Sequence, residues 1–308
     1  MKALLFPGQG SQFVGMGKDL YSNFDIVKKT FQQADEKLNY NLSKIFLEGP
    51  EEELKLTKNT QPAILTISYS IFKLIRDEFK IEIKDLKYFA GHSLGEYSAL
   101  VCSGSLDFLD ALYLLHERGK SMQEAVPKGT GSMLAVMGIK TDELESIISK
   151  LDKNLGVCEI ANDNSENQII LSGHLNSINE ISKVLKNMKK RSILLPVSAP
   201  FHCSLMKPAA EKMEKKINNT NFKNPNINLI ANVTAKEISD PNKIKNLLVQ
   251  QIVSKVRWRE SILYMIDNGI KEFIEIGPGK VLSGLVKRIN DKVLTKSINT
   301  IDDVKNLK

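Results

Sequence analysis

The sequence has few cysteines and no long apolar run. Its three cysteines, Cys102, Cys158 and Cys203, lie at wide and unrelated spacings, which fits neither a disulfide framework nor a zinc site. Segments rich in Leu and Ile are interrupted by Lys, Asp or Glu, and none approaches the ~18 apolar residues that a membrane helix needs. The first apolar stretch stops at Pro7 and is too short for the core of a signal peptide. We therefore expect a protein of the reducing cytoplasm that does not span a membrane.

The composition is that of an ordinary globular protein. Hydrophobic residues make up 42% and charged residues 26% of the 308 residues, which argues against disorder and against a coiled coil. At roughly 100–200 residues per domain, this length predicts one large domain or two. The 43 basic and 36 acidic residues give a formal net charge of +7, which favours an acidic partner but does not by itself indicate nucleic-acid binding.

The pattern of apolar residues predicts an α/β fold. Residues 2–6 are typical of a buried strand, and helical periodicity runs through 21–38 and 62–78. A short strand at 86–90 leads into a glycine-rich turn and an apolar helix. After about residue 200 the same kinds of element return, with helices expected at 206–217 and 243–253 and strands at 227–232 and 273–277.

Between these two parts lies a stretch with a different order of elements. The expected order is β-α-β-β-α-β, which is that of a ferredoxin-like unit. The first of its helices is expected to begin at Thr141 as a capping residue. The strands are expected at 132–139, 157–163, 168–173 and 191–197, and the helices at 141–151 and 175–188. We interpret this stretch as an insertion into the α/β fold.

A G-x-S-x-G pentapeptide is the strongest chemical signal. It covers residues 91–95, with Ser93 at its centre, between a predicted strand and a predicted helix. Glycines suit the sharp turn of a nucleophile elbow, because side chains at the flanking positions would collide across it. The turn lifts the serine hydroxyl to the N-terminus of the next helix, where free N–H groups favour negative charge. We predict that Ser93 is a nucleophile; a purely structural turn is the alternative.

A serine nucleophile needs a base, and the sequence offers four histidines. His92 in the turn, His116 inside a predicted helix and His174 at the end of a strand suit structural roles. His202 lies where the chain returns to the main fold, and we predict that it is the base. No carboxylate is next to His202 in the sequence and no histidine follows it, unlike the order in an ordinary α/β-hydrolase. We therefore expect a neutral third group, such as a backbone carbonyl that accepts the Nδ1–H.

Arg118 and Met122 lie one turn apart in a predicted helix, so both can face one pocket. An exposed arginine is the commoner case. If it is buried near the serine, however, the planar guanidinium of Arg118 suits a substrate carboxylate, in a pair worth roughly 1.5–3 kcal/mol.

The loop FPGQGSQ is a candidate for the second donor of an oxyanion hole. One N–H group is expected from Leu94, directly after the nucleophile, and the other from Gln9, whose neighbours Gly8 and Gly10 leave its backbone accessible. The spacing of these glycines is not that of a dinucleotide fingerprint. The sequence EIGPGK at 275–280 also lacks the spacing of a phosphate loop and is interpreted as a strand-to-helix turn.

Taken together, these stretches resemble the malonyl-CoA:acyl carrier protein transacylases, which are acyltransferases of fatty acid synthesis and of polyketide synthases. The resemblance spans nearly the whole chain. Its motifs are FPGQGSQFVGMG near the start, TQPAILT at 60–66, GHSLGEYSAL at 91–100, ERGKSMQEA at 117–125, PVSAPFHCSLMKPA at 196–209, QIVSKVRW at 251–258 and EIGPGKVLSGLVKR at 275–288. It implies an α/β-hydrolase-like domain with a parallel sheet, formed by 1–127 and 198–308, and an inserted ferredoxin-like subdomain at 128–197.

The resemblance also implies a role for each site residue. Ser93 is then the nucleophile, His202 the base and Arg118 the ligand of the malonyl carboxylate, while Gln9 and Leu94 supply the oxyanion N–H groups. The main-chain carbonyl of Gln251 would orient the histidine. At Arg257 and Trp258 the sequence differs from the family pattern, and this difference bears on whether Gln251 is the residue that matches the family position. Further residues expected to line the pocket are Gln61, Asn162, Met122 and Phe201. Phe201 before the histidine and Leu94 after the serine resemble the malonyl-selective members.

The activity that follows is ping-pong malonyl transfer. Malonyl-CoA would acylate the serine, and the phosphopantetheine thiol of an acidic acyl carrier protein would then take the malonyl group for fatty acid biosynthesis. No metal and no bound redox cofactor is expected, and neither a nucleic acid nor a membrane is expected as a partner. A serine esterase or thioesterase, a non-enzymatic scaffold and an acyltransferase of a polyketide pathway are the alternatives.

Overall fold

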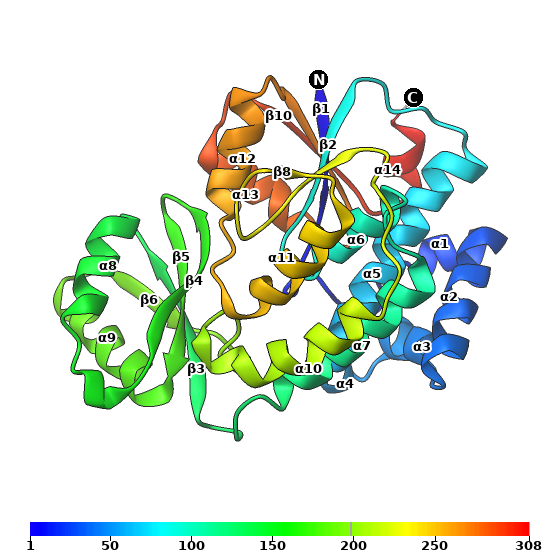
Figure 1. Cartoon of the computed structure of the whole chain (residues 1–308). Coiled ribbons are helices and arrows are strands. Elements are labelled where there is room, and N and C mark those ends of the chain that lie inside the picture. Colours follow the sequence, from blue (N-terminus) through cyan, green and yellow to red (C-terminus); the bar gives the residue numbers. More distant parts are fainter. Residues whose placement is uncertain (198, 308) are drawn as a thin grey trace.

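The computed structural model describes residues 1–197 and 199–307, so Ser198 and Lys308, at two limits of the predicted domains, lie outside the described residues. The main body is built on a six-stranded sheet with the strand order β10-β9-β1-β2-β7-β8 (Figure 1). Neighbouring strands are parallel except for the pair of β7 and β8. The strands are β1 (Lys2–Phe6), β2 (Leu86–Gly91), β7 (Asn228–Ile230), β8 (Glu237–Ile238), β9 (Glu272–Ile276) and β10 (Leu294–Ile298).

Helices cover both faces of this sheet. Side chains alternate between the two faces of a strand, and in β1 Leu4 and Phe6 join one hydrophobic cluster whereas Ala3 and Leu5 join another. The first cluster includes side chains of α2, α5, α6, α7, α10 and α11, and the second includes side chains of α12 and α13. Burial on both faces explains the unbroken apolar run of β1. These helices are α2 (Asp25–Leu38), α5 (Thr57–Lys73), α6 (Gly95–Cys102), α7 (Phe108–Gln123), α10 (Lys207–Asn218), α11 (Pro241–Val253), α12 (Trp258–Asp267) and α13 (Val281–Ile289).

A second, antiparallel sheet lies beside the main body, in green at the left of Figure 1. Its strand order is β4-β5-β3-β6, and α8 and α9 pack on one face around Leu134 and Leu171. The opposite face carries Met133 and Ile170, which belong to a hydrophobic cluster of the main body. The elements are β3 (Gly131–Met137), α8 (Thr141–Ser149), β4 (Cys158–Ser165), β5 (Gln168–His174), α9 (Leu175–Asn187) and β6 (Arg191–Leu194).

Strand β4 connects the second sheet to the main body. The N–H of Asp163 donates to the carbonyl of Val256 at 3.0 Å, and the N–H of Val256 donates to the carbonyl of Ala161 at 2.8 Å. The guanidinium of Arg259 also holds the Asp163 carboxylate through bonds of 2.8–3.1 Å. These contacts fix the part of β4 that leads to Asn162 and Asn164.

The observed architecture confirms the predicted fold class, an α/β main sheet with a ferredoxin-like unit. Some details were wrong. The helix expected at 21–38 is divided by Phe24, whose extended backbone directs its ring against Phe79. Thr141 is the first helical residue of α8 rather than its cap, and its side chain makes no capping bond. The strand expected at 191–197 ends at Leu194, after which a single bond from the N–H of Leu195 to the carbonyl of Met133 at 2.9 Å continues the contact with β3.

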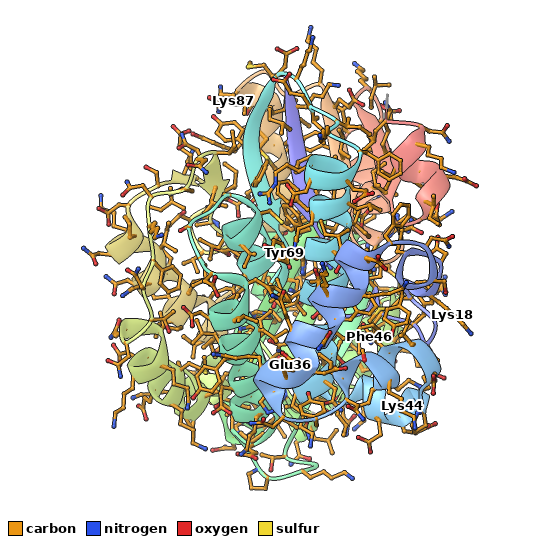
Figure 2. All side chains as sticks on the ribbon, turned by 90° about the vertical axis from the view of Figure 1, so that its right-hand side faces the viewer. Lys18, Glu36, Lys44, Phe46, Tyr69 and Lys87 are labelled. Carbon is orange, nitrogen blue, oxygen red and sulfur yellow. The ribbon has the colours of Figure 1, made fainter. Side chains whose placement is uncertain are left out.

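Several short elements were not anticipated from the sequence. Most of them belong to the main body, where Figure 2 labels the exposed residues Lys18, Glu36 and Lys44 and the buried Phe46. Phe46 packs edge-on against Phe31 at 4.8 Å. Within the described residues, no helix combines the length and the apolar character needed to cross a membrane. The additional elements are α1 (Lys18–Asn23), α3 (Leu42–Glu48), α4 (Glu51–Lys55), a π-helical turn (Leu74–Glu78), two 3-10 turns (Lys153–Leu155 and Ser204–Met206) and α14 (Ile301–Lys305).

Candidate active site

The turn between β2 and α6 forms an elbow around Ser93. β2 ends at Gly91 and α6 begins at Gly95, and Ser93 between them has a φ of 53°. A left-handed backbone is strained for a residue with a side chain and is concentrated at functional sites. Glycine is needed on both sides, since a Cβ at Gly91 would overlap the main chain of Gly95 and a Cβ at Gly95 would overlap the carbonyl of Phe6. The turn thus places the serine hydroxyl just before the first turn of α6.

His202 lies within hydrogen-bonding distance of this hydroxyl. Its Nε2 is 2.7 Å from Ser93 Oγ, and its Nδ1 donates to the main-chain carbonyl of Gln251 at 2.8 Å. The second bond fixes the tautomer in which Nε2 can accept a proton. Burial, aided by the positive charge of Arg118, lowers the pKa of His202 to about 3. The imidazole is therefore neutral near pH 7, as a general base must be.

Arg118 reaches the same place from α7 and is only 1% exposed. Its Nη2 donates to Ser93 Oγ at 3.1 Å and to Gln251 Oε1 at 2.8 Å, and its Nη1 donates to Gln61 Oε1 at 2.8 Å. Because a guanidinium can only donate, Ser93 Oγ accepts this bond and its own proton is available to His202. All three of these acceptors are neutral. The buried cation is thus held without a carboxylate as a direct partner among the described residues.

These groups border a cavity of about 190 Å³ whose walls come from both sheets. The main body supplies the elbow and Arg118, and the second sheet supplies a mostly apolar wall. All the predicted site residues except Gln251 line the cavity, and Gln251 is linked to it through its bonds to Arg118 and His202. The lining residues are Gln9, Gln61, His92, Ser93, Leu94, Arg118, Met122, Met133, Asn162, Asn164, Ile170, Leu195, Val197, Phe201 and His202.

The two predicted oxyanion donors lie on the same rim. The loop after β1 packs directly on the elbow, where a Cβ on Gly8 would come within 2.5 Å of the carbonyl oxygen of His92. Gln9, the next residue of the loop, and Leu94 both line the cavity. Among the described residues, neither main-chain N–H has a hydrogen-bond acceptor. Two free donors next to a serine hydroxyl are the arrangement that stabilises a tetrahedral oxyanion.

Comparison with known proteins identifies the family. The model of the acyl transferase domain matches residues 3–302. The chain belongs to the acyltransferase family. A malonyl CoA-acyl carrier protein transacylase of Bacillus subtilis is 45% identical to this acyltransferase over 298 residues, which are 96% of this chain and 93% of the relative.

Solved structures agree with this assignment. The acyl-carrier-protein-S-malonyltransferase from Bartonella henselae superimposes on this acyltransferase with a TM-score of 0.96 at 41% identity, covering 99% of this chain and 97% of the other. A malonyl-transacylase in complex with its type II PKS acyl-carrier protein gives a TM-score of 0.95 at 37% identity, covering 99% and 98% of the two chains. These similarities confirm the resemblance found in the motifs.

One residue of the acyltransferase site, Asn232, was not predicted from the sequence. It follows β7, the neighbour of β2 in the sheet, and its Oδ1 accepts the N–H of Ser93 at 2.8 Å while its Nδ2 donates to the carbonyl of Gly91 at 2.7 Å. Both bonds hold the strained elbow from the side. An available signal was its position at the carboxyl end of a predicted strand, the edge where ligands bind in open α/β sheets.

His92 lines the acyltransferase cavity from within the elbow. Its Nε2 is 2.8 Å from Asn164 Oδ1, and its ring lies 5.4 Å from that of Trp258, which is fully buried. Burial lowers the pKa of His92. His92 therefore connects the elbow to β4, in keeping with the supporting role expected for it. Trp258, in the stretch expected to depart from the family pattern, packs against the ring of His92.

The two remaining histidines lie away from the cavity. His116 Nδ1 is 3.2 Å from the carbonyl of Lys58, and His174 Nδ1 accepts the N–H of Val157 at 2.8 Å. Both bonds are structural. In the part of the chain that the structure describes, no group of three or more His, Cys, Asp or Glu side chains is arranged to hold a metal ion.

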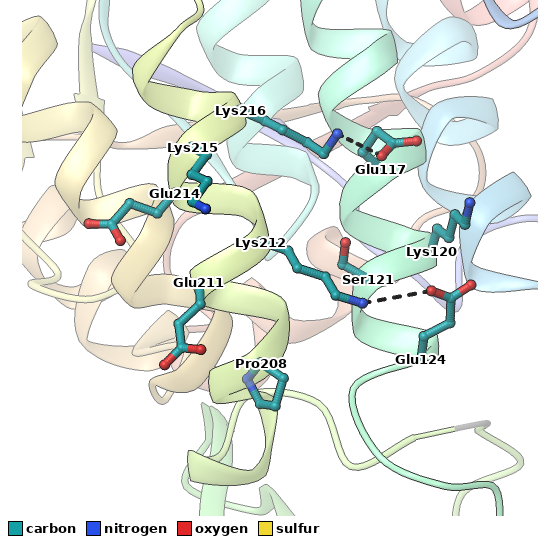
Figure 3. Close-up of a pocket in the computed structure, with 10 residues that line it drawn as sticks. All are labelled: Glu117, Lys120, Ser121, Glu124, Pro208, Glu211, Lys212, Glu214, Lys215 and Lys216. Carbon is teal, nitrogen blue, oxygen red and sulfur yellow. Dashed lines mark ion pairs between the residues drawn. The ribbon is translucent and has the colours of Figure 1, made fainter.

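A wider groove lies between α7 and α10 (Figure 3). Its walls are charged, and the charges pair across it, with Lys216 2.9 Å from Glu117 and Lys212 3.9 Å from Glu124. None of the predicted site residues lines it. We interpret the groove as a solvated contact between two helices, one of which carries Arg118 into the cavity.

Proposed function

We propose that this acyltransferase moves the malonyl group of malonyl-CoA to the phosphopantetheine thiol of acyl carrier protein, by way of a malonyl ester of Ser93. The observation that carries the proposal is the convergence of two groups, an imidazole and a guanidinium, on the hydroxyl oxygen of Ser93. Ser93 Oγ lies 2.7 Å from a neutral imidazole and 3.1 Å from a buried guanidinium. The contact with the imidazole suits nucleophilic attack by the serine. The contact with the guanidinium suits an acyl substrate whose far end is a carboxylate.

In the first half-reaction, His202 takes the proton of Ser93 as Oγ bonds to the thioester carbonyl carbon. The carbonyl oxygen becomes an oxyanion that the N–H groups of Leu94 and Gln9 stabilise. When this tetrahedral intermediate collapses, the C–S bond breaks and coenzyme A leaves as a thiol, taking the proton from His202. The malonyl group remains on Ser93 as an ester.

In the second half-reaction the carrier protein supplies the nucleophile. His202 accepts the proton of the phosphopantetheine thiol, and the sulfur attacks the ester carbonyl of the malonyl-serine. The ester bond between the malonyl carbonyl carbon and Ser93 Oγ then breaks, and Oγ recovers the proton from His202. The chemistry as written uses only protein side chains and main-chain donors, so we propose that the enzyme holds no cofactor of its own.

The carbonyl of Gln251 takes the place of the acid in a serine triad. It is neutral, so it orients His202 without adding a negative charge beside Arg118. A carboxylate at that position would pair with the guanidinium and compete with the malonyl group. We propose that this is why the third member is a main-chain carbonyl. Phe201 and Met122, both nearly buried at the cavity, then limit the room beside the malonyl group.

We propose an acidic acyl carrier protein as the partner. The net charge of +7 favours such a protein electrostatically, and one structural neighbour is a malonyl-transacylase in complex with an acyl-carrier protein. Supply of extender units for fatty acid biosynthesis is the function that the curated relatives support. We also propose the cytoplasm as its location, because all three cysteines are free thiols.

We propose that residues 128–197 act as a subdomain inserted between 1–127 and 198–308. Support comes from its separate hydrophobic cluster under α8 and α9. The face of its sheet that carries Met133 and Ile170 closes the cavity over the elbow. In this arrangement the insertion shields the ester from water.

Mass spectrometry of the enzyme after mixing with malonyl-CoA tests the proposal. A malonyl adduct is expected on the wild-type chain and should be absent from Ser93→Ala. Addition of a holo carrier protein should remove the adduct and produce malonyl-carrier protein. Release of free malonate instead would indicate the esterase or thioesterase alternative, and carrier binding without transfer would indicate a scaffold.

A further inference from the structure

The side chain of Gln251 lies among the site residues but does not line the cavity. Its Oε1 accepts from Arg118 Nη2 at 2.8 Å, and its Nε2 donates to Glu96 Oε2 at 2.8 Å and to the carbonyl of Ser93 at 3.1 Å. An amide has one accepting end and one donating end. If the amide turned over, its NH₂ group would face the guanidinium and two donors would meet.

Glu96 supplies the acceptor that prevents this reversal. It lies in the first turn of α6, three residues after the nucleophile, and is only 4% exposed. A carboxylate accepts and cannot donate, so it holds the NH₂ end of Gln251 and leaves the oxygen end for Arg118. Of the acceptors at this NH₂ end, Glu96 is the only charged one and makes the shortest bond, so it contributes most to the orientation of the amide.

The same oxygen of Glu96 also supports the nucleophile. Glu96 Oε2 accepts the main-chain N–H of Asn232 at 3.1 Å, and the side chain of Asn232 accepts the N–H of Ser93 at 2.8 Å. One branch of the network therefore leads to the elbow, and the other leads through Gln251 to the base and the guanidinium. None of the reaction steps uses Glu96 directly.

We propose that Glu96 is a positioning residue for acyl transfer, whose carboxylate orients the Gln251 amide and Asn232 and thereby holds Ser93, His202 and Arg118 in register. The inference rests on the proposed function, because it assigns a role within that reaction. It also accounts for the missing acid of the triad: a carboxylate is present, but it acts on the histidine's support rather than on the histidine.

The surroundings of Glu96 argue that its charge is retained for this task rather than for stability. Burial raises its pKa to about 7, although hydrogen bonds from Asn232 and Gln251 and the charge of Arg118 act in the opposite direction. A carboxyl group whose folded pKa lies above its unfolded value favours folding at low pH, and this contribution is lost as the pH rises through about 7. A neutral glutamine would avoid that loss.

The other ionisable groups that face Glu96 do not change charge in this range. Arg118 of α7 is a permanent cation, and burial raises the pKa of Tyr97, the next residue of α6, to about 12. Burial is the main cause that lowers the pKa of His202, beyond Gln251, to about 3, and a substrate carboxylate on Arg118 offsets only the smaller contribution of that charge. A fall in the malonylation rate as the pH drops below about 7 is therefore expected to come from protonation of Glu96.

The test measures the rate of Ser93 malonylation at saturating malonyl-CoA, with thermal stability, for Glu96→Gln and Glu96→Asp. Glu275→Gln is the matched control: Glu275 is also a buried glutamate, but it accepts the N–H groups of Leu282 and Ser283 at the start of α13. Glu96→Gln keeps the size of the side chain and removes the charge, whereas Glu96→Asp keeps the charge and leaves a gap.

We expect Glu96→Gln to melt within a few degrees of the wild type but to malonylate about tenfold more slowly or worse. Glu96→Asp should be faster than Glu96→Gln, and Glu275→Gln should stay within about threefold of the wild type. The inference is overturned if Glu96→Gln stays within about threefold, or if Glu96→Gln is at least as fast as Glu96→Asp, since packing alone would favour the residue of equal size.

The wild-type chain provides a second measurement, in case a variant does not fold. Its malonylation rate should decline as the pH is lowered, with a midpoint near pH 7. A rate that stays constant from about pH 5.5 to 8 would overturn the inference. Failure of the proposed function looks different, because the wild type would then form no malonyl adduct at any pH.

Discussion

Replacement of Arg118 by alanine tests the specificity of the site most directly. The guanidinium is 1% exposed and makes bonds of 2.8–3.1 Å to three neutral acceptors, one of which is the nucleophile. The carboxylate of a malonyl group is a stronger acceptor than any of them. We therefore expect Arg118→Ala to reduce the preference for malonyl-CoA over acetyl-CoA.

The size of the effect follows from the burial of the pair. A hydrogen bond between charged groups contributes about 1.5–3 kcal/mol, and about 1.4 kcal/mol corresponds to a tenfold change in rate. The ratio of kcat/KM for malonyl-CoA to that for acetyl-CoA should fall about 10- to 150-fold. The substitution also leaves Gln61 and Gln251 without their donor, which slows both substrates. The ratio of the two removes this common loss.

The assay is steady-state transfer to a holo carrier protein from each donor, with Arg118→Lys as the control. Lysine keeps the positive charge but lacks the planar fork that suits a carboxylate, so an intermediate ratio is expected. If Arg118→Ala leaves the ratio unchanged while both rates fall together, the guanidinium supports the site without recognising the malonyl carboxylate, and the reasoning is refuted.

Two further predictions concern the supports of the site. Asn232→Ala removes the side chain that binds the Ser93 N–H and the Gly91 carbonyl, so the free energy of unfolding should fall by about 1–3 kcal/mol and malonylation should be slower. Chemical denaturation measures the stability, and adduct formation measures the rate. An unchanged rate would contradict the role of this residue at the elbow. Arg259→Ala leaves the buried carboxylate of Asp163 without its bidentate partner. The free energy of unfolding should fall by about 1–3 kcal/mol, and KM for malonyl-CoA should rise because β4 carries part of the cavity wall. A loss of stability with an unaltered KM would show that β4 does not need this anchor.

The parts of the site that the sequence predicted are those that lie in short, self-contained motifs. The elbow around Ser93 is defined by five consecutive residues, and its glycines are required by contacts within the turn itself and with β1. The spacing of Arg118 and Met122 could place both on one face of a predicted helix, but the role of Arg118 was expected only through resemblance to a family. His202 was recognised from the point at which the chain returns to the main fold.

The network behind these residues was not predictable in the same way. Gln251 joins Arg118 and Glu96, which lie 133 and 155 positions away in the chain. Its main-chain carbonyl was expected at the histidine only through resemblance to a family. No local pattern gives the direction in which a buried amide points, because that direction is set by the donors and acceptors that the fold brings together.

Errors in the predicted elements have a similar origin. Phe24 divides a helix that the periodicity made continuous, since its ring packs on Phe79, 55 residues later in the sequence. Thr141 has the right chemistry for a cap but lies one residue inside α8. Tertiary contacts override local preference at such positions. The buried strand at residues 2–6, by contrast, was predicted from a local apolar run, and the structure shows that its side chains alternate between two hydrophobic clusters.

The electrostatics of the site couple the choice of substrate to its chemistry. Besides burial, the charge of Arg118 lowers the pKa of His202, which weakens the base in the empty enzyme. A malonyl carboxylate paired with Arg118 offsets that charge and makes the imidazole more basic, whereas an acetyl group cannot. The malonyl preference should therefore appear in the acylation rate constant at saturating donor as well as in the half-saturation concentration. A preference confined to the half-saturation concentration would show that Arg118 only binds the substrate and does not act on the base.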